Sequence, residues 1–172
     1  GSENATYRAS IKDSKSKGVI PNSELDRTYM NFNGSLKHGG GLTSEVSFNY
    51  VNTHTKGRPA LGYSPVQGNP TQSFNQWFQR QLDMDKVSNY RLDDGTLTSW
   101  NIRSNTNTRP LYWNSPYFSI NENVPVDDRD RIYGNYGLTY KLNSNWELQA
   151  KVKADMYDFV TEDRIASGGL ST

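Results

Sequence analysis

The sequence predicts an all-β protein built from long antiparallel strands, and three observations support this fold class. Apolar and polar residues alternate with period two over several stretches, and no helical periodicity of comparable length is present. These stretches run about ten residues or more, whereas strands of soluble proteins are usually about five or six residues long. The connections are short at one end and long at the other. We expect five strands, at about residues 5–14, 26–37, 42–54, 130–142 and 146–160, and one long loop at about residues 56–128.

The first expected strand is followed by a turn at residues 18–27, with the sequence GVIPNSELDR. Pro21 fixes its own φ angle, and the side chains of Asn22 and Ser23 supply the hydrogen bonds that are typical of turns. Arg27 then begins the second alternating stretch. The turn therefore joins two antiparallel neighbours.

The other expected strands form hairpins with the same alternation. The even positions from Thr28 to Leu36 are mostly apolar, and the same parity resumes from Leu42 to Tyr50 after the stretch HGGG, whose glycines permit a tight reversal. Near the C-terminus, NSN at residues 143–145 separates two further alternating stretches. Each hairpin therefore has one apolar face and one polar face.

This alternation is found in two classes of protein. The half-buried sheet of a soluble sandwich alternates in this way. The strands of an outer-membrane β-barrel also do so; they need about 9 to 11 residues to cross the bilayer, and they join short turns on one side to long loops on the other. Tyr140 and Trp146 flank a short turn on the apolar face, where a barrel carries its aromatic girdle. The pattern alone leaves both classes open.

The composition excludes several functional classes. With 33% hydrophobic residues and a mean hydropathy of -0.86, the 172-residue chain has little material for a thick soluble core. The net charge of +1 comes from interspersed acidic and basic residues, so no nucleic-acid partner is expected. The absence of cysteine excludes disulfides and thiolate metal sites. No apolar stretch is long enough for a transmembrane helix.

Several longer sequence stretches resemble those of a known protein family, in addition to the alternation. The stretches YRASIKDSKSKGVIPNSELDR, FNGSLKHGGGLTSEVSFNYVNTHTKGRP, FNQWFQRQLDM, PLYWNSPYFSINEN and DDRDRIYGNYGLTYKLNSNWELQAKV together resemble the SusC/RagA family of TonB-dependent outer-membrane transporters. The resemblance covers nearly the whole chain. Its most specific parts are KGVIPNS and QWFQRQLDM, which general strand propensity does not produce.

The resemblance implies a large transmembrane barrel in the bacterial outer membrane, closed inside by a plug domain that the TonB complex engages. Such transporters import oligosaccharides or peptides together with a SusD-like surface lipoprotein. We expect the chain to be without the plug, the TonB box and a leader of that family, and about five strands cannot close so large a barrel. We therefore expect a partial barrel, a segment from the early part of the barrel, with the long loop extracellular. An alternative from another class is a soluble β-rich module that binds carbohydrate or protein.

In the barrel interpretation, the polar faces of the strands line the lumen. The residues expected there are Arg27, Asn31, Asn33, Glu45, Asn49, Arg131, Asn135, Lys151, Lys153 and Asp155. The apolar faces are expected to contact outer-membrane lipid.

The expected long loop is dense in aromatic residues, which can stack on sugar rings or anchor a protein partner. For most of them we favour the alternative that they form a small core that keeps the loop folded. The residues that we single out as candidate contacts with cargo or partner are Trp77, Arg80, Trp100, Tyr112, Trp113 and Tyr117.

Local patterns also predict structure within this loop. The apolar spacing in FNQWFQRQLDMDKV predicts a short helix with Phe74, Trp77, Phe78 and Leu82 on one face. YRLDDGTLTSW predicts a small hairpin that turns at Asp94-Gly95. RPLYWNSPYF contains two prolines that restrict the backbone, and it predicts an ordered extended segment.

No catalytic, cofactor or metal site is predicted. Asp127, Asp128 and Asp130 offer oxygen ligands for Ca²⁺, but the interleaved Arg129 and Arg131 neutralise their charge, so we expect a solvated charged rim instead.

The two histidines also suggest no metal site, since His38 and His54 are expected at opposite ends of one hairpin arm. HGGG resembles an esterase oxyanion motif, but the chain has no nucleophile elbow to accompany it. We therefore expect a transporter segment or a binding module and not an enzyme.

Overall fold

The structure is a computed structural model that describes residues 1–63, 68–76 and 78–170. The chain divides into two compact units, which we describe separately. The sheet unit comprises residues 1–15, 25–54 and 128–160, and the loop unit comprises residues 16–24, 55–127 and the C-terminal segment from residue 161.

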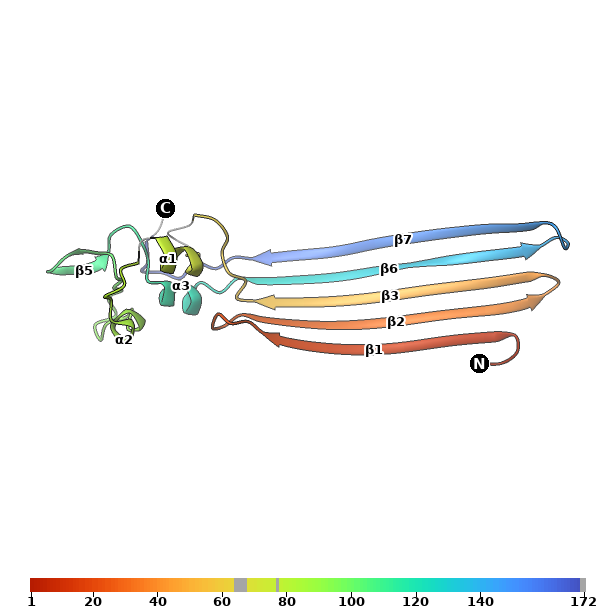
Figure 1. Ribbon diagram of the computed structural model, residues 1–172, viewed down its shortest axis with the longest axis horizontal. Coiled ribbons are helices and arrows are strands. Elements are labelled where there is room, and N and C mark those ends of the chain that lie inside the picture. The colour runs from red at the N-terminus through yellow and green to blue at the C-terminus, as the bar shows by residue number, and fades with distance from the viewer. Residues whose placement is uncertain (64–67, 77, 171–172) are drawn as a thin grey trace. The chain divides into compact units, whose positions relative to one another are not determined.

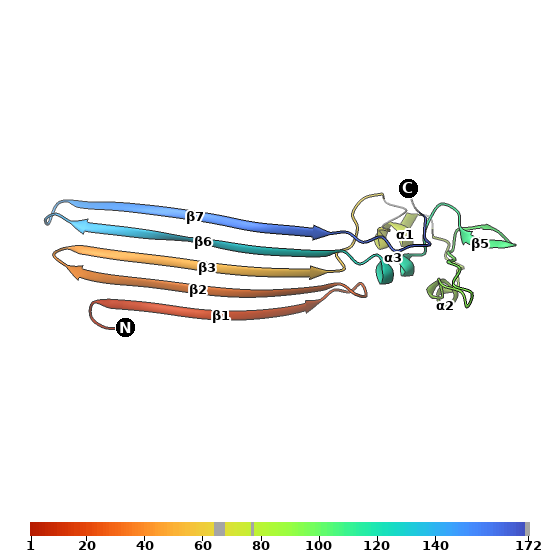
Figure 2. The ribbon, with the colours of Figure 1, turned by 180° about the vertical axis from the view of Figure 1, so that it is seen from behind.

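The sheet unit is an open antiparallel sheet of five strands in the order β1-β2-β3-β6-β7 (Figure 1). Its strands are β1 (Ala5–Lys17), β2 (Glu24–Gly39), β3 (Leu42–Lys56), β6 (Val126–Lys141) and β7 (Glu147–Glu162). β6 pairs directly with β3, although more than sixty residues separate them in the sequence. That connecting segment forms most of the loop unit. Figure 2 shows the same order from behind, with β1 and β7 at the two edges.

All five strands are longer than the alternation predicted, with 13 to 16 residues each. The added residues are mostly polar on both faces, for example at the end of β1 and at the end of β3. Backbone pairing continues through them, although no apolar alternation marks them. The all-β class and the antiparallel sheet are thus confirmed.

The turns at the ends of the strands have the expected chemistry. Gly39, Gly40 and Gly41 reverse the chain between β2 and β3 with φ angles of 84°, 58° and 85°, a region that glycine enters without steric cost. In the turn before β7, the Asn143 side chain accepts hydrogen bonds from the backbone N–H groups of Asn145 (2.9 Å) and Trp146 (3.0 Å). Both reversals are therefore specified locally by the sequence.

The turn at residues 18–27 is held by Asn22. Among the described residues, Asn22 is the only one other than glycine with a positive φ, at 62°. Its side-chain amide donates to the Ile120 carbonyl (3.1 Å) and to the Asn121 side chain (2.9 Å). The residue predicted to stabilise this turn thus also ties it to a distant segment of the loop unit.

The loop unit is folded and is not one irregular connection. It contains three short helices, α1 (Pro70–Gln76), α2 (Met84–Ser88) and α3 (Pro116–Glu122), and a small antiparallel hairpin of β4 (Ile102–Ser104) and β5 (Asn107–Pro110). Its buried apolar side chains are those of Val87, Leu97, Trp113 and Phe118. None of the described helices is both long and apolar enough to cross a membrane.

The local predictions within this unit have mixed outcomes. The expected helix at Phe74–Leu82 is wrong in extent, since α1 ends at Gln76 and both Phe78 and Leu82 lie outside it. Trp77 lies outside the described residues. The small hairpin is confirmed by an antiparallel bridge between Arg91 and Leu97.

The expected extended segment at residues 109–118 is also wrong in its second half. Ser115 caps α3 by accepting a hydrogen bond from the Tyr117 backbone N–H, and Pro116 occupies the first turn of the helix. Proline is favoured there, because its missing N–H would have no partner within the helix. The second proline therefore starts a helix.

Candidate functional site

The ten residues expected on the polar faces include a connected network on one face of the sheet. The Asn33 amide donates to the Asn31 side chain (2.6 Å), Asn31 donates to the Asn49 side chain (2.6 Å), and Asn49 donates to the Tyr133 carbonyl (3.3 Å). This amide ladder crosses β2, β3 and β6. Each of these amides can both donate and accept, so the ladder presents mixed polarity to a ligand.

The remaining members of the set lie on the same face. Arg131 and Asp155 form an ion pair across β6 and β7, with the Arg131 Nε donating at 2.8 Å. Glu45 and Asn135 line a shallow hollow beside Asn33, and Lys153 lines a neighbouring one. Lys151 passes over Gly137, where a Cβ atom would lie 3.2 Å from the lysine Cε.

Arginines and tyrosines gather at one end of the polar face. Arg27 donates to the Tyr29 hydroxyl (3.0 Å) and to the Thr53 hydroxyl (3.3 Å). The Arg131 guanidinium lies 4.9 Å from the centre of the Tyr133 ring, within the range of a cation–π contact.

A third arginine, Arg129, lies over the Tyr157 ring at 4.8 Å. A hollow of about 250 Å³ lies in this region, and we call it the arginine hollow. The residues that line it are Arg27, Tyr29, Val51, Thr53, Arg129, Arg131 and Tyr133.

Sequence reasoning missed the role of Arg129. Arg129 and Arg131 were expected to neutralise the aspartates between them, and this expectation is wrong, because successive strand residues point to opposite faces. Asp128 instead pairs with the ring of His54 (2.6 Å), and Asp130 accepts from the amide of Asn52 (3.0 Å). The strand parity that predicted the faces would have separated these charges.

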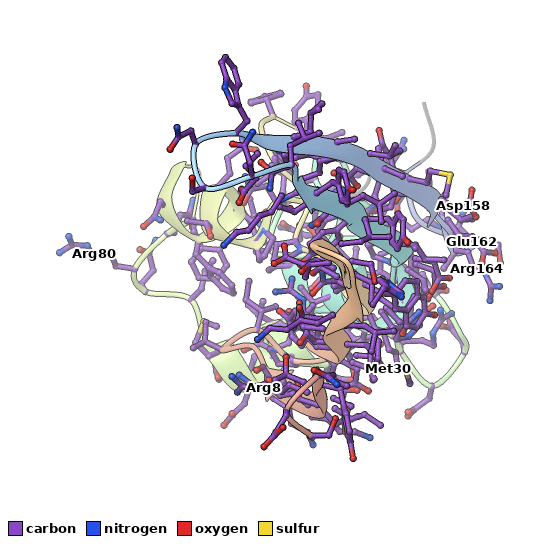
Figure 3. The ribbon with its side chains drawn as sticks, turned by 90° about the vertical axis from the view of Figure 1, so that its right-hand side faces the viewer. Arg8, Met30, Arg80, Asp158, Glu162 and Arg164 are labelled. Atoms are coloured by element: carbon purple, nitrogen blue, oxygen red, sulfur yellow. The ribbon has the colours of Figure 1, made fainter. Side chains whose placement is uncertain are left out.

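The opposite face of the sheet is apolar along most of its length. Figure 3 views the sheet along its strands and places Arg8 and Met30 on opposite sides of it. The side chains on the apolar face are largely exposed in this chain, for example Leu148 at 61% and Val152 at 72%. An apolar surface of this extent marks an interaction surface.

On this face each strand carries a polar residue next to an apolar or aromatic one at a corresponding level, although β7 also carries Val160 beyond its polar residue. Side-chain hydrogen bonds join Asp13 to Thr28 and Asn52 to Asp130 across neighbouring strands. The next position on the same face of each strand, toward the short turns, is apolar or aromatic. The successive pairs are Asp13 and Ile11, Thr28 and Met30, Asn52 and Tyr50, Asp130 and Ile132, and Asp158 and Met156.

The aromatic candidates in the loop unit fall into two groups. Trp113 is buried and packs edge-to-face with Tyr63 at 5.0 Å, so it is a core residue. Tyr117 contacts Phe74 and Trp100 contacts Phe78, at 6.4 Å and 5.8 Å between ring centres. These contacts match the interpretation that the aromatic residues mostly hold the loop unit together.

Two candidates remain accessible in the loop unit. Tyr112 is 68% exposed, and Arg80 extends into solvent from its loop (Figure 3). Trp77, the sixth candidate, lies outside the described residues.

A second hollow, of about 240 Å³, lies within the loop unit between the segments around Pro21, Pro59 and Ile165. The charged residues that line it, Arg58, Asp163 and Arg164, all have partners. Arg58 donates to Asp127 (2.6 Å), and this hydrogen bond raises the pKa of Arg58 above its ordinary value. The expectation that Asp127 belongs to a solvated rim is wrong, since the residue is only 8% exposed.

The described residues contain no cluster of three or more histidines and carboxylates that would hold a metal ion. Comparison with known proteins finds no family model that matches the chain and no matching sequence among the curated proteins.

Proposed function

We propose that the chain is part of the barrel wall of a SusC/RagA-type TonB-dependent transporter in the bacterial outer membrane. In this proposal, the transporter imports oligosaccharides or peptides together with a SusD-like lipoprotein and is driven by the TonB complex through a plug domain. The quoted stretches that resemble the family support the proposal. The observation that carries it is the corresponding level at which a polar residue lies next to an apolar or aromatic one on all five strands.

The dimensions of the apolar face support a membrane-spanning role. From Ile132 to Leu142 the outward-facing positions of β6 and the residue that follows it are all apolar, aromatic or glycine. Ten residues of antiparallel strand span about 34 Å, and a tilt of about 40° reduces this to about 26 Å. The lipid-facing band of an outer-membrane barrel is about 25 Å tall.

The open edges also support the proposal. β1 and β7 are 13 and 16 residues long and have no further strand beside them in the sheet. Long unpaired edges and an exposed apolar face are a hazard in water, whereas a barrel removes the edges and lipid covers the face.

The test is the location and behaviour of the full-length protein that contains this chain. We expect it in the outer-membrane fraction of a density gradient, resistant to extraction at alkaline pH, and compact on unheated gels but extended after boiling. A protein that is soluble and monodisperse without detergent would instead support the β-rich binding module.

A further inference from the structure

The two faces of the sheet unit carry charges of opposite sign, although the whole chain is almost neutral. Strand parity places three acidic residues on the polar face, namely Glu45, Glu147 and Asp155. It places nine basic residues there, namely Arg8, Lys12, Arg27, Lys37, Arg129, Arg131, Lys141, Lys151 and Lys153. The charges on the apolar face are mainly those of Asp13, Asp26, Asp128, Asp130 and Asp158. The polar face is therefore strongly cationic and attracts anions.

The cationic charge has a focus at the arginine hollow. Among the described residues, neither Arg27 nor Arg129 has a carboxylate oxygen within 4.0 Å of its guanidinium group. Arg27 is held by two hydroxyl groups, and Arg129 lies over the Tyr157 ring. These contacts orient the guanidinium groups and leave donors available for a ligand.

Guanidinium groups that are oriented in this way bind carboxylate or sulfate groups through paired hydrogen bonds. The hollow of about 250 Å³ has roughly the volume of eight water molecules. It therefore has room for a charged group with the unit that carries it, while the rest of a longer ligand extends along the face.

The surroundings of the hollow indicate which kind of anion is bound. The ladder of Asn33, Asn31 and Asn49 lies on the same face, where Asn49 donates to the carbonyl of the hollow residue Tyr133. Amide groups donate and accept at once, as sugar hydroxyl groups do, so the ladder favours a polyhydroxylated ligand over an acidic peptide.

We propose that the arginine hollow binds the carboxylate groups of an acidic oligosaccharide. The inference rests on the proposed function and narrows its cargo from oligosaccharides or peptides to uronate-containing oligosaccharides. Arg27 and Arg129 bind the carboxylate, and the amide ladder binds the hydroxyl groups of the adjoining sugar units. Arg131 is held by Asp155 and supports the edge of the site.

The experiment is calorimetric titration of the full-length protein in detergent micelles at low salt. The probes are trigalacturonate, the neutral trisaccharide maltotriose, and triglutamate. We expect trigalacturonate to bind at least tenfold more tightly than either of the others, with an affinity that falls as salt is added. Equal binding of maltotriose, or equal or tighter binding of triglutamate, would overturn the inference.

The variant that localises the site is Arg129→Gln, since removal of this side chain leaves no carboxylate unpaired among the described residues. We expect it to weaken trigalacturonate binding about tenfold or more, the usual effect of losing a charged hydrogen bond. Lys37→Gln removes a charge from the far end of β2 on the same face and serves as the matched control, with a change below twofold.

Unchanged affinity of Arg129→Gln for trigalacturonate would overturn the assignment to the hollow. If the melting temperature of the variant also fell, an acidic segment of the protein would be the group that binds the arginines.

The result also separates the inference from the proposed function. Selective uronate binding by a protein absent from the outer membrane would leave the inference standing and refute the transporter. An outer-membrane protein without this selectivity would do the reverse.

Discussion

The sheet unit and the loop unit differ in how much apolar surface they bury. All the described apolar side chains that are buried, such as Trp113 and Phe118, belong to the loop unit. In the sheet unit the one buried residue is Gly137, although the strands are long and fully formed. The loop unit thus buries apolar side chains in a small core of its own. The sheet unit has no such core, and its apolar side chains stay exposed unless other molecules cover them.

The largest effect is expected in the core of the loop unit. Phe118 is 1% exposed and packs against Tyr90, so Phe118→Ala leaves a cavity that lowers the free energy of unfolding of this unit by about 3 to 5 kcal/mol. Native-state proteolysis of the loop unit measures the loss. Tyr112→Ala, at an exposed site, is the control and changes this energy by less than about 0.5 kcal/mol. Equal effects of the two changes would contradict a core at Phe118.

A smaller effect is expected on the apolar face of the sheet. Phe48→Lys places a charge where we expect lipid and lowers the unfolding free energy of the full-length protein in lipid by about 2 to 4 kcal/mol. Ser47→Lys places the same charge on the polar face and is the matched control, which we expect to be mild. Urea titration of the protein in lipid vesicles measures both changes. If Ser47→Lys proved the more damaging of the two, our assignment of the faces would be reversed.

The half-buried ion pair of Arg58 and Asp127 in the loop unit comes next. Asp127→Asn removes the negative charge beside Arg58 and lowers the unfolding free energy of this unit by about 1 to 3 kcal/mol. Asp163→Asn is the control, because Asp163 is half-exposed and lies 3.7 Å from Arg58. The same proteolysis assay compares the two variants, and a smaller loss for Asp127→Asn than for the control would show that the pair of Arg58 and Asp127 contributes little.

The smallest effect is a pH dependence confined to the loop unit. Burial, together with the Glu122 carboxylate, raises the pKa of Tyr90 above its ordinary value. The folded unit then keeps the Tyr90 proton to a higher pH than the unfolded chain, so this contribution is intact below about pH 10 and is lost above it. Tyr90→Phe removes the titrating group, and its proteolysis profile between pH 8 and 11 should be flatter than that of the original chain. Identical profiles would show that Tyr90 has no part in this dependence.

The sequence predicted the sheet because each strand alternates over most of its length and the turns carry the residues that turns require. The Gly39–Gly41 reversal and the Asn143 turn are local features, so one sequence is sufficient to find them. The ends of the strands were missed, since residues that are polar on both faces leave no pattern to detect.

The loop unit was harder to predict because its structure depends on contacts between distant segments. The end of α1 at Gln76 and the burial of Asp127 against Arg58 are not marked by any local periodicity. The start of α3 at Pro116, in contrast, had a local signal in Ser115, the capping residue before the proline.

The candidate site was predicted in part. Parity placed Arg27, Asn31 and Asn49 on one face correctly, but the arginine hollow depends on which strands are neighbours. Arg27 and Arg129 line the same hollow although they are far apart in the chain, because β6 pairs with β3 across the whole loop unit. Alternation within single strands does not reveal that pairing.

The backbone N–H of Gly57 donates to the Pro125 carbonyl (2.8 Å) just beyond the ends of β3 and β6. The chain thus leaves the sheet at Gly57 and returns to it at Pro125. The nearly seventy residues between these two positions form an insertion between two paired strands. Because this hydrogen bond closes the loop at the ends of the two strands, the pairing of β3 with β6 does not depend on the length of the sequence between them. Insertions and deletions within the loop are therefore compatible with the same sheet, provided that the contacts of Asn22 with Ile120 and Asn121 are kept.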